Sequence, residues 1–271
     1  ATHDIIVWGL GDETQRRNKA NGTPVLKKPM TSELGCVTPW VITPGVWSED
    51  ELRHHAQQLC VCFIANLGCN CLSPKVVVLP TQDCWPQRAK FLAMLVEEIE
   101  AKPLLPPYYP GMHMRYTEMV SAATKQGAQK SVFETAYPPK QYGESFGSRL
   151  PWTLLHLPEN IHLPEAPSQF SLTHEPFAPI LSIASVPGDS GEDFLKNATQ
   201  FCNSKVMGTL SATLIAHPSI PAEAVEKAID DLHYGCIGIN TWTGRAYAFQ
   251  AAPWGAPPGE NIHDVTTGIG Q

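Results

Sequence analysis

The chain has 271 residues, of which 43% are hydrophobic and 17% are charged, and its formal net charge is −7 at pH 7. A chain of this length can bury a substantial core, as one large domain or two small ones. The acidic balance gives no indication of binding to nucleic acid or to an anionic membrane surface. The longest apolar run is far shorter than a membrane span, so we expect no membrane-spanning helix.

The eight cysteines are spread along the chain. A dense disulfide framework is typical of small secreted domains, and a chain of this length does not need one. No signal-peptide pattern opens the sequence. We therefore expect a reducing intracellular compartment, without a further assignment of location.

The N-terminal part of the chain predicts two strands and then a long helix. Residues 4–9 form an apolar run typical of a buried strand, and residues 37–43 have the same character. Ser48 and Glu51 match a capping box, in which each side chain bonds to the backbone of the other residue. A helix is therefore expected to begin at this point, with an apolar face at spacings of three and four residues.

The remainder alternates strand and helix patterns. Further strands are expected at residues 76–79, 208–216 and 237–242, and further helices after Pro86, at 116–125, at 192–201 and after Pro221, with loop from residue 253 onward. Alternation of this kind predicts an α/β fold with a mostly parallel sheet.

A short polar loop at Asn66–Cys71 separates the first long helix from the strand at residues 76–79. Catalysis by sulfur needs access to the thiol and an environment that stabilises the thiolate. Because α/β proteins place their chemistry outside the carboxyl edge of the sheet or on the loops beside it, Cys71 is a candidate nucleophile. The alternative is a buried cysteine that acts only as a small hydrophobic residue.

Two carboxylates are further candidates for functional residues, and Glu33 could assist this thiol. Glu33 precedes a predicted strand, and a thiol that forms an acyl-enzyme needs a group that activates water. Glu175 lies in the proline-bounded segment 174–179, which leads into a strand at Ile180. The alternative for Glu33 is a solvated surface charge, and for Glu175 an ordinary proline-shaped turn.

Other polar residues are candidates to line a cleft. They are Asn66, Cys69 and Asn70 in the first loop, and Asn240 and Trp242 at the end of the last predicted strand. Side chains of these types also serve turns and caps, so this alternative stays open.

The pairs Cys60/Cys62 and Cys69/Cys71 admit a metal or redox alternative, because four thiolates suit tetrahedral zinc. Their C-x-C spacing differs from the usual C-x₂-C, and the first pair falls within the predicted helix. A disulfide between Cys69 and Cys71 would be strained. We therefore assign no metal ligands.

In chain order, these segments resemble motifs of the aldehyde dehydrogenase superfamily. Glu33–Gly35 is similar to the family's E-L-G-G, with Cys36 in place of the second glycine, and Asn66–Cys71 is similar to N-x-G-Q-x-C, with Cys69 in place of the glutamine. Four later segments resemble, in order, the family's E-x-F-G-P, N-x-x-x-x-G-L-x-A, G-x-V-x-V-N and P-F-G-G: residues 175–179, 203–213, 237–240 and 253–255.

The resemblance implies a three-layer Rossmann-like fold of the aldehyde dehydrogenase catalytic-domain type. It also implies NAD(P)-dependent oxidation of an aldehyde to a carboxylic acid. Cys71 would form a thiohemiacetal and then a thioester, its backbone N–H would help to hold the oxyanion, and Glu33 would activate water. Glu175 and Phe177 would contact the nicotinamide ribose and ring of NAD or NADP.

Members of this family are considerably longer than this chain. We therefore expect residues 1–43 to be the end of a cofactor-binding domain, residues 44–255 a catalytic domain, and residues 256–271 a C-terminal loop that stops before the oligomerisation strand. The implied partners are a small aldehyde and another protein chain or a missing N-terminal half, and the chain alone is not expected to turn over with NAD(P)⁺. The alternative is a non-catalytic structural or interaction subunit built on the same domain.

Overall fold

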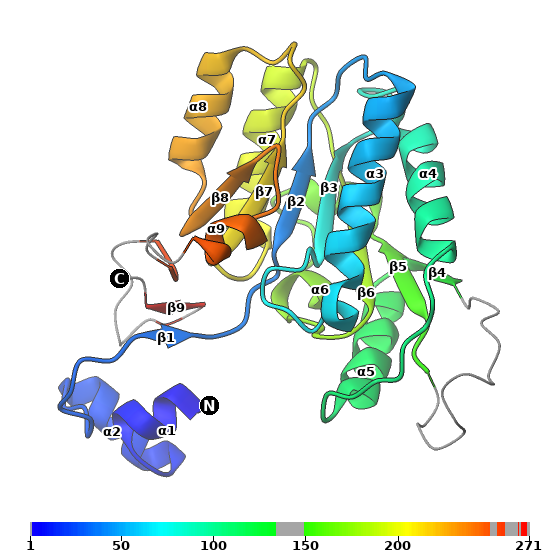
Figure 1. Ribbon diagram of the computed structural model, residues 1–271. Helices are drawn as coiled ribbons and strands as arrows, with labels where there is room; N and C mark the ends of the chain where they lie inside the picture. The colour runs from blue at the N-terminus through cyan, green and yellow to red at the C-terminus, as the bar shows by residue number, and fades with distance from the viewer. Residues whose placement is uncertain (1, 134–148, 250–253, 258–264, 266, 270–271) are drawn as a thin grey trace.

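The computed structural model describes residues 2–133, 149–249, 254–257, 265 and 267–269. Its body is a sheet with helices packed on it, and two further helices lie apart from this body near the N-terminus (Figure 1). The strands of the sheet are Pro39–Ile42 (β2), Val76–Pro80 (β3), Gln129–Phe133 (β4), Trp152–His156 (β5), Ile180–Val186 (β6), Ser211–Ile215 (β7) and Cys236–Ile239 (β8). The helices are Thr2–Trp8 (α1), Asp12–Asn21 (α2), Glu49–Ile64 (α3), Arg88–Glu100 (α4), Met112–Lys125 (α5), Phe170–Thr173 (α6), Gly191–Lys205 (α7), Ala222–Asp231 (α8) and Gly244–Ala248 (α9).

The seven strands are ordered β4-β5-β6-β3-β2-β7-β8. Every neighbouring pair is parallel except β4 with β5. The chain moves from β2 to β3 in one direction along the sheet and from β6 to β7 in the other. Because parallel crossovers are right-handed, α3 and α7 cover opposite faces. The expected three-layer, mostly parallel α/β sheet is confirmed.

The predicted start of the long helix is also confirmed. The hydroxyl of Ser48 accepts a hydrogen bond from the backbone N–H of Glu51 (3.3 Å), and the backbone N–H of Ser48 donates to the Glu51 carboxylate (2.8 Å). The buried face of α3 consists of Leu52, Ala56, Leu59, Cys60, Cys62 and Phe63. Capping and apolar spacing therefore act together to place the helix whose end leads to Cys71.

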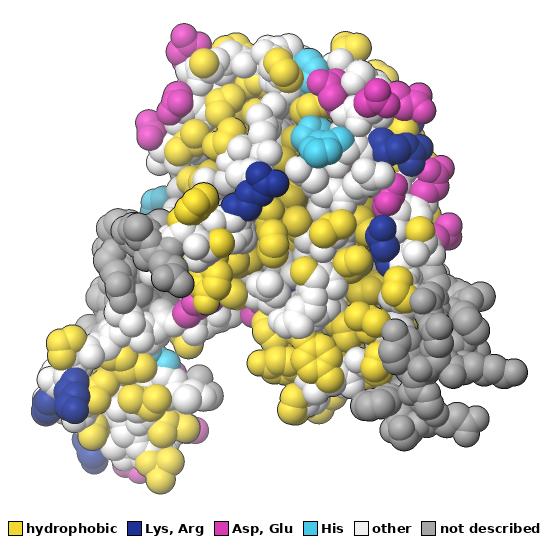
Figure 2. Space-filling model, in the orientation of Figure 1, with side chains coloured by type: hydrophobic (Ala, Val, Ile, Leu, Met, Phe, Trp, Pro, Cys, Tyr) yellow, Lys and Arg dark blue, Asp and Glu magenta, His cyan; other side chains and the backbone are white. Residues whose placement is uncertain are grey.

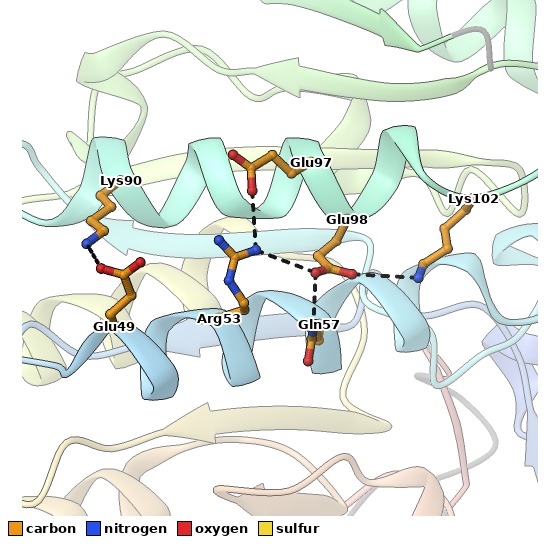
Figure 3. Close-up of polar contacts among 7 residues, drawn as sticks. All are labelled: Glu49, Arg53, Gln57, Lys90, Glu97, Glu98 and Lys102. Atoms are coloured by element: carbon orange, nitrogen blue, oxygen red, sulfur yellow. Dashed lines mark hydrogen bonds and ion pairs between the residues drawn. The ribbon is translucent and has the colours of Figure 1, made fainter. Parts of the chain in front are cut away.

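Helix α3 is also joined to α4 by polar contacts along their exposed sides (Figure 3). The guanidinium of Arg53 lies 3.2 Å from the carboxylate of Glu97 and 3.8 Å from that of Glu98. The other contacts of this row are Lys90–Glu49, Gln57–Glu98 and Lys102–Glu98. Because exposed ion pairs contribute little to stability, the buried face of α3 supplies most of its attachment to the body.

The predicted strand at residues 4–9 is wrong, because α1 occupies this segment. A short apolar run does not distinguish a strand from a helix. Val7 is buried while Ile5 and Ile6 are each 46% exposed, which is the pattern of a helix covered on one side. The covering element is α2, whose Asn18 side chain donates to a backbone carbonyl of α1 at 2.8 Å.

The C-terminal segment differs from the loop that was expected. Gly268–Ile269 (β9) pairs antiparallel with Ser32–Glu33 (β1) in a separate two-stranded sheet. This strand exists because of its distant partner, so local sequence did not predict it. Residues 250–253 and 258–264 lie outside the described part of the chain. The domain boundaries at 43/44 and 255/256 stay a prediction.

Within the described residues, no helix has the length and apolar character that a membrane span requires.

Candidate active site

Cys71 lies in the loop between α3 and β3, a few residues before β3 begins. This position is at the amino edge of the parallel sheet, so the site does not lie outside the carboxyl edge, where α/β proteins often bind ligands. The second location that the sequence analysis considered, a loop beside the sheet, is the one observed. The side chain of Cys71 is half-buried.

The backbone of this loop takes an uncommon path. Asn66 and Leu67 both have φ of 57°, and Gly68 has φ of 72°. Asparagine and glycine tolerate this left-handed region, whereas leucine is strained there. The Asn66 side-chain amide donates to the carbonyl of Cys69 at 2.7 Å, which closes the turn locally. The loop therefore has a conformation that its surroundings must maintain.

The structure brings Glu33 to Cys71. Burial raises the pKa of the Cys71 thiol to about 12, and hydrogen bonding with the Glu33 carboxylate and its negative charge add to this rise. The indole N–H of Trp254 donates to the same carboxylate at 3.1 Å. Glu33 is held beside the thiol by β1, which pairs with β9. The pair can exchange a proton, and at rest the thiol keeps it.

Glu175 and Phe177 lie on the loop that follows α6, and the structure places this loop against the first one. The Cys69 thiol donates to the carbonyl of Phe177 at 3.1 Å. Burial raises the pKa of Glu175 to about 7, against the opposing charge of Lys75. One oxygen of the Glu175 carboxyl group, Oε1, is buried and has no hydrogen-bond partner among the described residues.

Two cations complete the cluster, and the sequence analysis singled out neither. Lys75 is 1% exposed, and burial lowers its pKa to about 8. Arg115 of α5 donates to the carbonyl of Phe177 (3.3 Å from Nη2), and its guanidinium carbon lies 6.0 Å from the Phe177 ring centroid. Lys75 had a usable sequence signal, since a lysine directly before a fully apolar strand is exceptional. Arg115 had none.

The polar residues of the first loop mainly hold the loop itself. Asn66 accepts a hydrogen bond from the hydroxyl of Tyr108, and the Asn70 side chain accepts one from the backbone N–H of Leu72 at 2.8 Å. The indole N–H of Trp242 donates to the carbonyl of Leu72 at 2.8 Å. Trp242 therefore lies beside the Cys71 loop, as a cleft residue would.

Asn240 does not join this cluster. It follows β8 at the carboxyl edge of the sheet, with φ of 53°. Its side-chain oxygen accepts a hydrogen bond from the backbone N–H of Ala216 at 2.8 Å. Asn240 therefore ties together two strand ends, far along the strand direction from Cys71.

Aromatic side chains border the site. The ring of Tyr109 meets the ring of Phe177 edge to face, with centroids 5.2 Å apart. Tyr108 and Tyr109 are 56% and 44% exposed and belong to a proline-rich segment before α5. Figure 2 shows hydrophobic side chains gathered at the lower part of the body in this view, where α5 lies in Figure 1. The exposed tyrosine Tyr109 therefore lies at the Phe177 side of the cluster.

The cysteine pair in α3 has a structural explanation. Cys60 and Cys62 are buried, and burial raises their pKa values to about 11 and about 12. All eight cysteines are free thiols. Among the described residues, no group of three or more His, Cys, Asp or Glu side chains is placed to hold a metal ion.

No protein-family model matches the sequence, and no curated protein matches it. Solved structures do. An aldehyde dehydrogenase from Mycobacterium tuberculosis complexed with NAD⁺ matches with a TM-score of 0.63 and 20% identity, over 95% of this chain and 46% of that one. A betaine aldehyde dehydrogenase from Staphylococcus aureus gives a TM-score of 0.67 and 15% identity, over 96% and 46%. An NADP-dependent glyceraldehyde-3-phosphate dehydrogenase from Bacillus halodurans complexed with NADP matches with a TM-score of 0.59 and 17% identity, over 85% of this chain and 43% of that one.

The chain has an aldehyde dehydrogenase fold. The expected resemblance and fold class are confirmed, and the chain spans less than half the length of these structures. At sequence identities of 15–20%, the similarity shows a shared fold and does not show a shared activity.

A nicotinamide cofactor is compatible with the residues of this aldehyde dehydrogenase fold. The buried Oε1 of Glu175, which lacks a partner among the described residues, can accept a hydrogen bond from a ribose hydroxyl. Phe177, two residues later on the same loop, has a partly buried aromatic ring. Glu175 and Phe177, which the sequence resemblance assigned to the cofactor, therefore lie on one loop, and their role toward a cofactor stays a prediction.

Proposed function

We propose that this chain carries the acyl-transfer chemistry of NAD(P)-dependent aldehyde oxidation, with Cys71 as nucleophile and Glu33 as base. The observation that supports this proposal is the interaction between the Glu33 carboxylate and the Cys71 thiol in a half-buried loop. A nucleophile beside a group that can take its proton is the minimum arrangement for covalent catalysis. The fold shared with aldehyde dehydrogenases makes an aldehyde the first substrate class to consider.

The proposed reaction begins with the neutral thiol, since the pKa of Cys71 is about 12. Glu33 accepts the thiol proton while the sulfur forms a bond to the aldehyde carbon, and the carbonyl oxygen becomes an alkoxide. The backbone N–H of Cys71 is the proposed donor to this oxygen. A bound nicotinamide would accept the hydride from the former aldehyde carbon, and the acyl group would remain on Cys71 as a thioester.

The second half of the reaction is hydrolysis. Glu33, after releasing its proton to solvent, takes a proton from a water molecule that adds to the thioester carbon. The carbon–sulfur bond then breaks, the leaving sulfur takes the proton from Glu33, and the carboxylic acid and the thiol are released. Throughout, Glu175 is proposed to bind the nicotinamide ribose and Phe177 to border the ring.

The proposal extends to the organisation of the protein. Because the chain spans less than half of the solved structures that it matches, another chain or segment is proposed to supply the rest of the cofactor site. Residues 44–255 are proposed to be the catalytic domain, and turnover with NAD(P)⁺ is not expected from this chain by itself. Robust cofactor-dependent oxidation by the purified chain would contradict that part of the proposal.

An activated ester tests the acyl-transfer steps without cofactor. With p-nitrophenyl acetate, Cys71 should release one equivalent of p-nitrophenolate in a burst and become acetylated, which intact mass would show. Cys71→Ser should abolish the burst. Glu33→Gln should accumulate the acetyl-enzyme, because water is no longer activated. Absence of Cys71-dependent acetylation would reject the proposed nucleophile.

A second candidate is a non-catalytic scaffold built on this fold. The observation that favours it is the raised pKa of Cys71, which keeps the thiol protonated at neutral pH. The ester experiment distinguishes the two candidates, since a scaffold would show no acetylation at Cys71 above the level of the other cysteines.

A further inference from the structure

A fully buried lysine lies beneath the Cys71 loop. Lys75 is 1% exposed, although an ammonium group is costly to bury unless hydrogen bonds and charges compensate for lost hydration. Its backbone is fixed on both sides, directly before the central strand β3. The N–H of Lys75 donates to the carbonyl of Thr38 (3.0 Å), and its carbonyl accepts from the N–H of Ser182 (2.8 Å). The position of the Lys75 side chain is therefore set by a backbone that hydrogen bonds hold in place.

The ammonium ends among backbone carbonyls of the loop. Nζ of Lys75 donates to the carbonyl oxygen of Gly68 (2.7 Å) and to that of Asn70 (2.8 Å). Gly68 and Asn70 flank Cys69, and Asn70 comes directly before Cys71. The left-handed turn at Asn66–Gly68, in which Leu67 is the strained residue, is therefore held from its buried side by the Lys75 ammonium.

The contact with Asn70 also sets the direction of a catalytic group. The described chain has no cis peptide bond, and in a trans peptide the C=O and the N–H point in opposite directions. Turning the Asn70 carbonyl toward Lys75 therefore turns the Cys71 N–H away from it. The next carbonyl, that of Cys71, is held by the hydroxyl of Thr38 at 2.7 Å. Both peptide groups that flank the thiol are thereby fixed.

We propose that Lys75 is the positioning residue of this site: its ammonium orients the peptide N–H of Cys71 toward the oxyanion and supplies the positive charge that supports the thiolate. The inference rests on the proposed function, since it gives Lys75 a role in the chemistry of Cys71. Lys75 acts through the loop and through its charge and does not react itself.

The surrounding charges determine how this support depends on pH. The groups that face Lys75 are Glu175, Cys69, Cys71 and Cys36, while Glu33 faces Cys71 and Arg115 faces Glu175 and Cys69. Among the causes that shift the pKa of Cys71, the charge of Lys75 is the one that lowers it.

Two of these groups titrate near neutral pH. Glu175, with a pKa of about 7, becomes negative as the pH rises, and Lys75, with a pKa of about 8, loses its positive charge. Both changes disfavour the thiolate. Cys71 reactivity should therefore rise less than tenfold per pH unit between pH 7 and 9, whereas an isolated thiol well below its pKa rises tenfold.

The test compares alkylation and acylation of Cys71 in the wild-type protein, in Lys75→Met and in the control Lys90→Met, which removes an exposed cation of α4. Iodoacetamide reports thiolate formation, and p-nitrophenyl acetate also requires an oxyanion donor. Rates are followed by intact mass, with Cys71→Ser as the background for the other cysteines. Circular dichroism and thermal unfolding check the fold.

Lys75→Met should slow alkylation at pH 8 by at least about tenfold and slow acylation further, and its pH dependence should steepen toward tenfold per unit. Lys90→Met should match the wild type. If Lys75→Met does not fold, Lys75→Gln removes the charge but keeps a donor for the loop carbonyls, and the wild-type pH dependence remains measurable without any variant.

Wild-type rates in a folded Lys75→Met or Lys75→Gln protein would overturn the inference, and so would a tenfold rise per pH unit in the wild type. Failure of the proposed function would look different. In that case alkylation of Cys71 would depend on Lys75 while no acetyl-enzyme formed.

Discussion

Gly68 packs on the carbonyl group of Ala178 so closely that a Cβ at Gly68 would lie 2.5 Å from the Ala178 oxygen. This contact joins the loop that carries Cys71 to the loop that carries Glu175 and Phe177. The two loops come from distant parts of the chain and meet at the amino edge of the sheet. Absence of a side chain at Gly68 is therefore a condition for assembling the cluster.

Gly68→Ala should destabilise the protein by about 1–3 kcal/mol or more, because it combines an unfavourable φ of 72° with the clash against Ala178. Urea denaturation measures the change in the free energy of unfolding. Gly22→Ala is the matched control, since Gly22 also has positive φ (62°) but a Cβ there meets no atom within 4 Å. Equal decreases in the free energy of unfolding of both variants would mean that the close contact with Ala178 does not add to the effect of the unfavourable φ.

Glu33→Gln should lower the pKa of Cys71, because the hydrogen bond and the negative charge of Glu33 both help to raise it. Alkylation by iodoacetamide at pH 8 should accelerate by about tenfold if the pKa falls by one unit. The same variant should deacylate slowly in the ester experiment, so the two rates move in opposite directions. Glu49→Gln removes an exposed carboxylate of α3 and should change neither rate. Slower alkylation in Glu33→Gln would contradict this prediction, because it would mean that proton acceptance by Glu33 outweighs its effect on the pKa of Cys71.

Glu175→Gln should have an effect on stability that depends on pH. The folded-state pKa of Glu175 is about 7, above its ordinary value of 4.5, so the folded protein binds this proton more tightly than the unfolded chain does. The stabilisation is therefore complete below pH 4.5 and is lost as the pH rises through 7.

The glutamine variant lacks this loss. Relative to the wild type, its free energy of unfolding should increase between pH 5 and pH 8, by on the order of 3 kcal/mol at most, since one pKa unit corresponds to about 1.4 kcal/mol. Urea denaturation of both proteins at the two pH values measures the difference. Glu100→Gln, at an exposed position of α4, should show no such trend. A difference that is constant with pH would contradict burial of an ionisable carboxyl group.

Arg53→Met should lower the free energy of unfolding by less than about 1 kcal/mol, although Arg53 contacts two carboxylates in Figure 3. The side chain of Arg53 is 41% exposed, so water and salt screen its ion pairs. Leu59→Ala, on the buried face of the same helix, should cost about 2–5 kcal/mol. Measuring the free energy of unfolding of the two variants at low and high salt tests whether apolar burial outweighs the ion pairs. A larger loss of stability in Arg53→Met than in Leu59→Ala would contradict this prediction.

Local sequence determined much of the fold. The capping box at Ser48, the one-sided apolar spacing of α3 and the β-branched run of β3 each specify an element from neighbouring residues. The same reasoning failed at residues 4–9, because a short apolar run fits either a helix or a strand until its packing partner is known.

For the candidate site, the sequence by itself identified Cys71, Glu33, Glu175 and Phe177 as separate pieces with suitable chemistry and order. Only the tertiary structure decided that they meet, that they meet at the amino edge, and that Lys75 lies beneath them. The physical reason is that periodicity and caps report contacts between near neighbours. The pKa of Cys71, the orientation of its peptide N–H and the burial of Lys75 depend on charges and carbonyl groups that distant segments bring to one place.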